Sequence, residues 1–275
     1  MSIQTPIANA RMYAVAPSAI SAWRALFAHV AQASGIELTV IDHPFPAPLS
    51  ALWSRTDLAC AFICGWPYTR GVADVVPVAA PVPADPRAAG RPVYWSDLVV
   101  RTHDPAQTLE DLRGRTVGYT VADSQSGFNA LRHFLRGHTP SPLFGAESGP
   151  LITPRRVIEA VISGAIDAGP VDSIAHALLR LHAPDLADQV RTIAQTQPTA
   201  APLLVASPGL DEHRLTLLRR TFIGLCHDPA AQPLLAALAL AGFAEPLPPT
   251  FYQQMQTQAL AAEAAGIRHL EAKAS

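Results

Sequence analysis

Strand-like and helix-like segments alternate strictly over the first third of the chain. The most regular strand-like segment, Leu58–Ile63 (LACAFI), is almost wholly apolar, as expected for a parallel strand that is buried on both faces. Because alternating strands and helices build βαβ units, this pattern predicts an α/β fold with a parallel sheet. The expected strands are 12–15, 37–41, Leu58–Ile63 and 75–79, and the expected helices are 18–35 and 49–54.

A second alternating block begins after a connection rich in breaker residues, 81–92 (PVPADPRAAGRP). Another proline-containing connection, 195–202, ends that block, and the apolar strand 203–207 is expected to return to the first block. The expected strands of the second block are 93–101, 116–121, 165–171 and 189–193, with helices 153–163 and 173–181. The remaining chain is expected to be helical, over 211–226, 229–241 and 250–265.

Two α/β blocks joined by two crossings predict two lobes that hinge on each other, as in a clamshell. We expect lobe 1 to be discontinuous and to comprise residues 1–94 and 203–275. Lobe 2 is then 95–202, which includes the second crossing.

The composition limits the kinds of partner. With 275 residues, 49% of them hydrophobic, the chain is long enough to bury a core in each of two lobes. The formal net charge of −2, without a basic block, argues against a nucleic-acid partner. No apolar run of about 18 residues occurs, so no membrane insertion is expected. The opening segment MSIQTPIANARMYAVAP lacks the features of a secretory signal, which predicts a cytoplasmic protein unless a signal was removed.

The residue types that carry catalysis show no recognisable arrangement. The three cysteines give no disulfide framework, and Cys60 and Cys64 lie in an apolar run, where we interpret them as small buried hydrophobes. The ten histidines are scattered, with no HxH or HExxH pattern. No compact Ser-His-Asp set is apparent. We therefore expect no metal, no cofactor and no catalytic activity.

One polar stretch, ADSQSGFNALRHFL (122–135), lies between an expected strand and an expected helix. Ser and Asp are good N-caps and Gly eases a turn, so the stretch is explained by local structure alone. Alternatively, its two hydroxyl groups and the free backbone N–H groups at the helix start bind an anion. Spacing within the stretch leaves both interpretations open.

Four motifs occur in a fixed order around this stretch: Tyr94-x-Ser96, DLRG (111–114), SQSGF (124–128) and SGAIDAGPVD (163–172). In order and spacing they resemble the phosphate-, phosphite- and phosphonate-binding proteins of ABC importers, which are class II periplasmic binding proteins. The resemblance implies a two-lobed clamshell, each lobe a mostly parallel sheet flanked by helices. It also implies a solute-binding protein that captures a small oxyanion between the lobes, with an ABC permease as partner. Members of the family are periplasmic.

The resemblance also implies roles for individual residues. Ser124, Ser126 and the backbone of Gly127 and Phe128 would hold the oxyanion. Gln125, between the two serines, stands where relatives often have Thr and is counted with the ligand-binding residues.

Asp172 would accept a hydrogen from a protonated oxygen or an amino group of the ligand, because a carboxylate otherwise repels an anion. Its alternative role is the N-cap of the helix expected at 173–181. Tyr94 and Ser96 would lie at the inter-lobe crossing. Trp66 and Tyr68 would be the first lobe's contribution, at the carboxyl end of a buried strand.

Several features depart from the family pattern and leave the identity of the ligand open, and the lack of a recognisable signal leaves a second interpretation of the function open. The contact loop CGWPY is bulkier than the usual Gly-Pro, and Asp123 adds a negative charge beside the expected anion. The alternative is a cytoplasmic enzyme, or a ligand sensor, that has the same clamshell fold and acts on a small carboxylate or phosphate compound.

Overall fold

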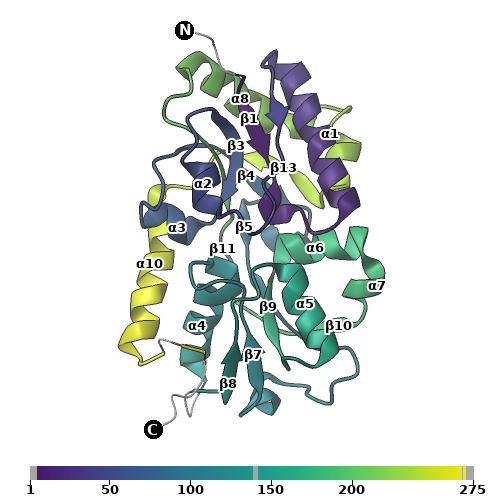
Figure 1. Cartoon of the computed structure of the whole chain (residues 1–275), viewed down its shortest axis with the longest axis vertical. Coiled ribbons are helices and arrows are strands. Elements are labelled where there is room, and N and C mark those ends of the chain that lie inside the picture. The colour runs from purple at the N-terminus through teal and green to yellow at the C-terminus, as the bar shows by residue number, and fades with distance from the viewer. Residues whose placement is uncertain (1–4, 139–141, 268, 271–275) are drawn as a thin grey trace. The chain divides into compact units, whose positions relative to one another are not determined.

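The computed structural model describes residues 5–138, 142–267 and 269–270. The chain divides into two compact units. Unit 1 comprises Met1–Val93 and Ala200–Pro249, and unit 2 comprises Tyr94–Thr199 and Thr250–Ser275. The first two crossings thus fall at Val93/Tyr94 and Thr199/Ala200, and the chain enters unit 2 again at Thr250 (Figure 1).

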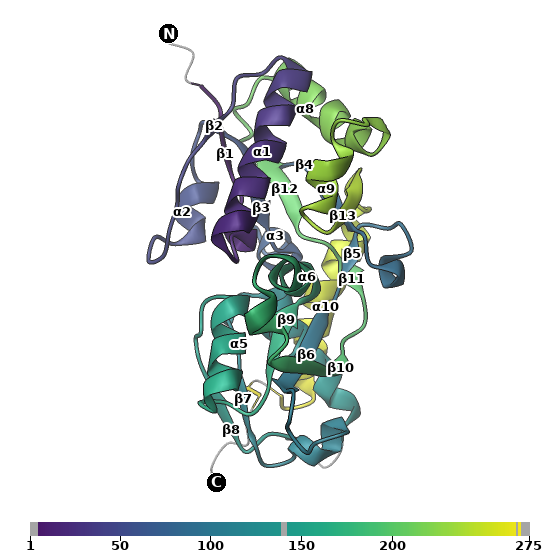
Figure 2. The ribbon, with the colours of Figure 1, turned by 90° about the vertical axis from the view of Figure 1, so that its right-hand side faces the viewer.

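Unit 1 is built on a six-stranded sheet with the order β13-β4-β12-β3-β1-β2 (Figure 2). The strand β1 is parallel to β2 and β3, whereas β12 runs antiparallel to both β3 and β4, and β13 is antiparallel to β4. The α/β class is as expected, but the sheet is mixed because the returning strand β12 is inserted between two strands of the first block. The strands are β1 (Ile7–Asn9), β2 (Thr39–Val40), β3 (Leu58–Ile63), β4 (Val76–Pro83), β12 (Leu203–Ala206) and β13 (Leu240–Ala244).

The local sequence accounts for most elements of unit 1. All six residues of β3 are buried, in agreement with its apolar sequence. Helix α1 (Pro17–Ser34) has Pro at its first position and ends at Gly35, which adopts the left-handed conformation that favours glycine. Trp23 and Phe62 meet edge to face, at 5.1 Å between ring centroids, in the core beneath α1. The other helical segments are η1 (Arg11–Tyr13), α2 (Leu49–Trp53), α3 (Gly65–Thr69), η2 (Pro86–Ala88), α8 (Glu212–Gly224), η6 (Leu225–His227) and α9 (Gln232–Ala236).

Two expectations for unit 1 are wrong. The expected strand 12–15 is replaced by β1, because Ile7 pairs with both neighbouring strands whereas the segment after Asn9 turns into η1. The helix expected at 229–241 is only the short α9. It is followed by β13, which pairs with the edge of β4, a non-local partner that the local sequence does not reveal.

Unit 2 contains a three-stranded sheet with the order β10-β6-β9, in which both pairings are antiparallel (Figure 2). Among the described residues of unit 2, the pair β7–β8 and a single bridge from Val117 to Ala168 are parallel. The expectation of a mostly parallel sheet in this lobe is therefore wrong, because β6 enters directly from the crossing and runs against both neighbours. The strands are β6 (Ser96–Arg101), β7 (Thr116–Gly118), β8 (Ala146–Ser148), β9 (Gly169–Asp172) and β10 (Val190–Gln195).

Short helices surround these strands, and two further strands, β5 (Val93–Tyr94) and β11 (Thr199–Ala200), pair at the crossings. None of the described helices is both long and apolar enough to cross a membrane. The helical segments of unit 2 are η3 (Leu109–Leu112), the π-helical η4 (Gln125–Asn129), α4 (Ala130–Phe134), η5 (Leu135–Gly137), α5 (Pro154–Ser163), α6 (Ser173–His182), α7 (Pro184–Ala187) and α10 (Pro249–Ala264).

The last helix, α10, is grouped with unit 2, whereas the sequence expectation placed all of 203–275 in lobe 1. The difference has a clear physical cause. Tyr252 and Met255 of α10 are buried, and the Asn129 amide donates a hydrogen bond to the Met255 carbonyl at 3.0 Å. Figure 1 shows α10 running alongside α4.

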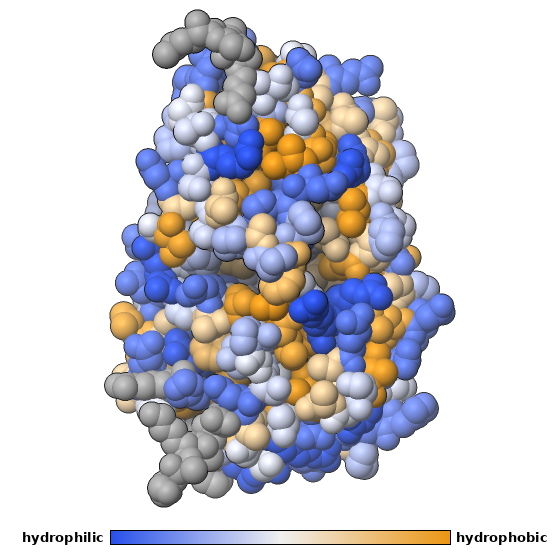
Figure 3. Space-filling model, viewed as in Figure 1, coloured by the Kyte–Doolittle hydropathy of each residue, from blue (hydrophilic) through white to orange (hydrophobic). Residues whose placement is uncertain are grey.

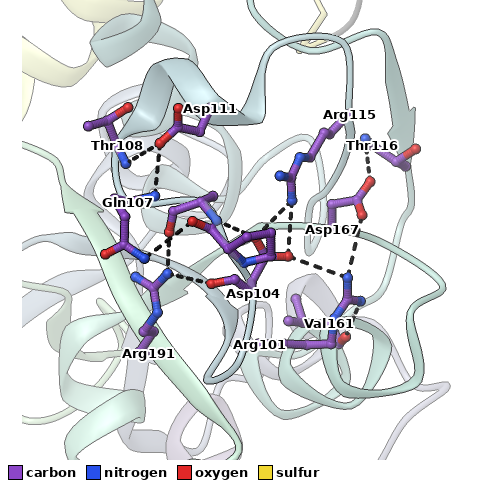
Figure 4. Close-up of polar contacts among 12 residues, drawn as sticks. Arg101, Asp104, Gln107, Thr108, Asp111, Arg115, Thr116, Val161, Asp167 and Arg191 are labelled. Carbon is purple, nitrogen blue, oxygen red and sulfur yellow. Dashed lines mark hydrogen bonds and ion pairs between the residues drawn. The ribbon is translucent and has the colours of Figure 1, made fainter.

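A charged cluster organises the part of unit 2 around the start of η3 (Figure 4). The buried Asp104 carboxylate accepts two hydrogen bonds from Arg115, at 2.9 and 3.0 Å. Arg101 bridges Asp104 and Asp167, at 3.5 and 3.7 Å, and Arg191 donates to the Asp104 carbonyl. Burial works against ionisation of Asp104, but the hydrogen bonds and neighbouring arginines hold its pKa below its usual value. The cluster therefore ties the loop after β6 to β10 and to the segment before β7.

On the surface, hydrophilic and hydrophobic residues alternate in small groups over the face drawn in Figure 3. Isolated apolar side chains on a surface are ordinary and carry no functional meaning by themselves. The large apolar side chains that are exposed are Ile20, Phe45, Val72, Leu181, Phe251 and Leu260.

Candidate functional site

The polar stretch after β7 forms a π-helical turn. Ser124 is the N-cap of η4, and its hydroxyl oxygen accepts a hydrogen bond from the Gly127 N–H at 2.9 Å. The Asn129 N–H donates to the Ser124 carbonyl, five residues back, which is the pattern of a π-helix. The capping interpretation of the stretch thus holds for Ser124, and the anion-binding interpretation stays a prediction. Within the described part of the chain, the N–H groups of Gln125 and Ser126 have no acceptor, so the turn keeps two free donors.

Gly127 allows this turn to lie against the end of β7. A Cβ atom added at Gly127 would lie 1.8 Å from the hydroxyl oxygen of Thr120 and 3.0 Å from that of Ser124. No other residue fits this close approach without movement of the neighbouring groups. The glycine of the motif is therefore explained by packing, and Thr120 is a participant that the sequence analysis missed.

Three residues that the sequence analysis singled out come together in unit 2. The Ser126 hydroxyl donates to the Asp172 carboxylate at 3.3 Å, and the Ser96 hydroxyl donates to the Ser126 carbonyl at 2.7 Å. Ser96 and Asp172 are direct partners in the pairing of β6 with β9. The sheet therefore fixes two members of the group, and the π-helical turn brings the third to them.

Asp172 has the capping role that was one of its two expected functions. Its Oδ1 atom accepts hydrogen bonds from the N–H groups of Ile174 and Ala175 at the start of α6, at 2.9 and 3.0 Å. Burial disfavours the charged form and raises the pKa of this carboxyl to about 6, in spite of the hydrogen bonds that favour the charge. Its second oxygen, Oδ2, faces the Ser126 hydroxyl. Asp172 is thus an acceptor that gains a proton in mildly acidic solution.

A second buried carboxylate lies close to Asp172 and was not anticipated. Asp97 accepts hydrogen bonds from Trp95 and Gln195 at 3.1 and 2.7 Å, and its Oδ2 atom lies 2.7 Å from Nδ1 of His176. Burial opposes its ionisation, but the hydrogen bonds with His176 and Gln195 hold the pKa of Asp97 below its usual value. The negative charge of Asp97 adds to the rise in the pKa of Asp172. No local spacing signals this pair, because Asp97 and His176 lie 79 positions apart in the sequence.

Gln125 does not present its side chain as a ligand group. Its amide nitrogen donates to Gln258 of α10 at 3.1 Å, and its amide oxygen accepts from Asn129 at 2.7 Å. The side chain is completely buried. The place of Gln125 among the ligand-binding residues stays a prediction. Because its side-chain amide is engaged by Gln258 and Asn129, its backbone N–H is the group that remains available.

The aromatic candidates occupy different surroundings. In unit 2, the buried Phe128 ring packs against Tyr119, at 5.2 Å between centroids, and Tyr94 is completely buried in β5. In unit 1, Trp66 and Tyr68 lie on α3, directly after β3, as the sequence predicted. Trp66 is buried with the Arg70 guanidinium 5.5 Å from its ring centre, and Tyr68 is half-buried.

The chemistry of the site is that of hydrogen bonding. Among the residues that the structure describes, no three His, Cys, Asp or Glu side chains are grouped so that they could hold a metal ion. The site offers hydroxyl groups, backbone donors at a helix start and one buried carboxylate acceptor. Such a set suits a small anion that carries a hydrogen atom.

Comparisons with solved structures agree with this fold. A binding-protein component of an ABC phosphonate transporter from Pseudomonas aeruginosa is 19% identical over 96% of this chain and 88% of that chain, with a TM-score of 0.76. PhnD1 from Prochlorococcus marinus, solved with methylphosphonate, is 16% identical over 94% and 98% of the two chains, with a TM-score of 0.73. A Xanthomonas citri protein bound to ATP is 18% identical over 95% and 98%, with a TM-score of 0.60. At these identities the similarity establishes the two-lobed fold of periplasmic binding proteins.

The family assignment comes from the sequence as a whole. No curated protein matches the chain. Residues 15–250 match the family described as "ABC transporter, phosphonate, periplasmic substrate-binding protein", which is a family of transport proteins and not of enzymes. This match spans most of the chain and includes the serine motif, Ser96 and Asp172. The chain belongs to the phosphonate-binding family of periplasmic substrate-binding proteins of ABC transporters.

Proposed function

We propose that this substrate-binding protein takes up a phosphonate, or a similar small oxyanion that retains a hydrogen atom, and delivers it to an ABC permease. The observation that carries the proposal is the contact between Ser126 and Asp172, at the adjoining starts of η4 and α6. In this arrangement hydrogen-bond donors and one buried acceptor lie side by side.

The donors are suited to the anionic oxygens of the ligand. The N–H groups of Gln125 and Ser126 are free within the described chain, and hydroxyl groups donate without adding a full positive charge. The Ser124 hydroxyl oxygen accepts from Gly127, so its hydrogen remains available to a ligand. Hydrogen bonds to a charged oxygen contribute roughly 1.5–3 kcal/mol each.

The acceptor selects the protonation state of the ligand. Asp172 Oδ2 accepts from Ser126, and in the complex it would accept from a hydroxyl or amino group of the ligand while Ser126 turns to donate to the anion. A fully deprotonated anion would face the carboxylate without a hydrogen between them and would be repelled. Methylphosphonate bound to PhnD1 of Prochlorococcus marinus belongs to the ligand class that we propose.

The test is calorimetric titration of the protein with methylphosphonate, phosphite and phosphate. We expect at least one of them to bind, and Ser126→Ala to weaken that binding by roughly tenfold or more, since about 1.4 kcal/mol corresponds to tenfold. Ser163→Ala, which changes an exposed serine at the end of α5, is the matched control and should bind as the unchanged protein does. Failure of all three anions to bind, or equal affinity in the Ser126 variant, would refute the proposal.

A further inference from the structure

The C-terminal helix α10 lies almost entirely beyond the part of the chain that matches the family, which ends at residue 250. It nevertheless supplies buried polar contacts to the π-helical turn of the candidate site. Figure 1 shows α10 beside α4, the helix that continues this turn. The function derived above assigns no role to α10.

The contacts form a continuous chain of hydrogen bonds. Gln258 of α10 accepts from the Gln125 amide at 3.1 Å, and Gln125 in turn accepts from Asn129 at 2.7 Å. The Asn129 amide also donates to the Met255 carbonyl of α10, at 3.0 Å. Arg132 donates to the Asn129 side-chain oxygen at 3.2 Å. Arg132 also lies 3.5 Å from the Glu263 carboxylate, a second link to α10.

This network joins the two ends of the π-helical turn, because η4 begins at Gln125 and ends at Asn129. π-helical turns are rare, and they persist where surrounding contacts favour them over the tighter α-helical turn. Gln125 and Asn129 are both completely buried, so their amide groups must have partners or the turn loses stability. The partners outside the turn come from α10 and from Arg132.

The geometry of this turn decides where the ligand-binding groups lie. Ser126 is the second residue of η4, and both its hydroxyl group and its carbonyl are engaged, with Asp172 and Ser96. Tightening η4 to an α-helical turn would rotate Ser126 relative to those two partners. It would also free the Asn129 N–H from the Ser124 carbonyl.

We propose that α10 positions the serine loop for ligand binding, with Gln258 acting through Gln125 and Asn129 to hold the π-helical turn. Gln258 is a positioning residue and does not contact the ligand. This inference rests on the proposed function, and it extends the binding apparatus beyond residues 15–250, which match the family.

The test compares three variants of the full-length protein. Gln258→Leu removes the acceptor for Gln125, whereas Gln258→Glu keeps an oxygen acceptor at the same place. Gln256→Leu changes an exposed glutamine of the same helix and is the control. The readouts are methylphosphonate affinity by calorimetry and amide hydrogen exchange at Gly127 and Asn129, whose N–H groups both bond to Ser124.

We expect Gln258→Leu to weaken binding by roughly tenfold and to accelerate exchange at both amides by a similar factor. Gln258→Glu should restore both quantities, and Gln256→Leu should change neither. Equal affinity and equal exchange in the two leucine variants would overturn the proposal. If the unchanged protein binds no anion, the proposed function fails separately. Exchange at Gly127 and Asn129 then decides the positioning role alone, with faster exchange in Gln258→Leu supporting it and unchanged exchange overturning it.

Discussion

Because the pKa of Asp172 is raised, we expect the free energy of unfolding to depend on pH through this residue. The carboxyl group is fully buried, and its pKa rises from 3.8 to about 6 on folding, mainly because burial disfavours the charge. The folded protein therefore binds more protons than the unfolded chain between these two values. Since the folded state holds the proton more tightly, the contribution of Asp172 to stability is greatest in acid and is lost as the pH rises toward neutrality.

The size of the effect follows from the same values. One unit of pKa difference corresponds to about 1.4 kcal/mol, so the change from 3.8 to about 6 amounts to about 3 kcal/mol. A typical domain has a free energy of unfolding of about 5–15 kcal/mol, so the effect is measurable. Asp172→Asn removes the titration and keeps a good N-cap for the two N–H groups of α6.

The assay is urea unfolding of the unchanged protein and Asp172→Asn at several values between about pH 4 and about pH 7. Histidines and other carboxylates titrate in both proteins, so their effects cancel in the difference. Relative to the variant, the unchanged protein should lose about 2.4 kcal/mol over this range, because part of the full effect is already lost at about pH 4. A difference that stays constant with pH, or that grows with pH, would show that folding does not raise the pKa of Asp172 and would refute the reasoning.

Three further predictions concern single residues. Ser124→Ala should lower the free energy of unfolding by about 1 kcal/mol, because it removes the cap on Gly127, and an unchanged melting temperature would contradict that role. Gly127→Ala should lower the free energy of unfolding by about 1–3 kcal/mol, because the added methyl group overlaps Thr120. Adding Thr120→Ala should recover part of this loss in denaturant unfolding, and no recovery would argue against the contact. Asp104→Asn should lower the free energy of unfolding by about 2 kcal/mol at neutral pH, because the charge that holds Arg115 is lost. The loss should be smaller in acid, where the carboxylate of the unchanged protein gains a proton, and a loss independent of pH would count against the ion pair.

The elements that the sequence predicted well are those set by local patterns. The apolar run of β3, the proline start and glycine end of α1, and the Asp172 cap of α6 all depend on residues close together in the chain. The cap of Ser124 belongs to the same group. Local patterns of this kind are legible because each involves one turn or one strand.

The features that the sequence did not reveal depend on distant partners. β13 forms because the edge of β4 is free to pair, and nothing within Leu240–Ala244 indicates that edge. The contact between Gln125 and Gln258 was not foreseen, because the two residues lie 133 positions apart in the sequence. The pair of Asp97 and His176 was missed for the same reason, since the two residues lie 79 positions apart. The spacing of residues within one motif cannot show which of their side chains contact a distant helix.

The position of β12 between β3 and β4 has a consequence for the order in which the chain can fold. As the polypeptide is synthesised, β3 and β4 emerge long before Leu203–Ala206, the strand that must lie between them. Until then each strand has an open edge, and open edges of apolar strands pair readily with other chains. Unit 2 likewise lacks α10 until Pro249–Ala264 has been synthesised. Neither unit can therefore be completed from the amino-terminal half alone, and a nascent chain halted before residue 200 should be prone to aggregation.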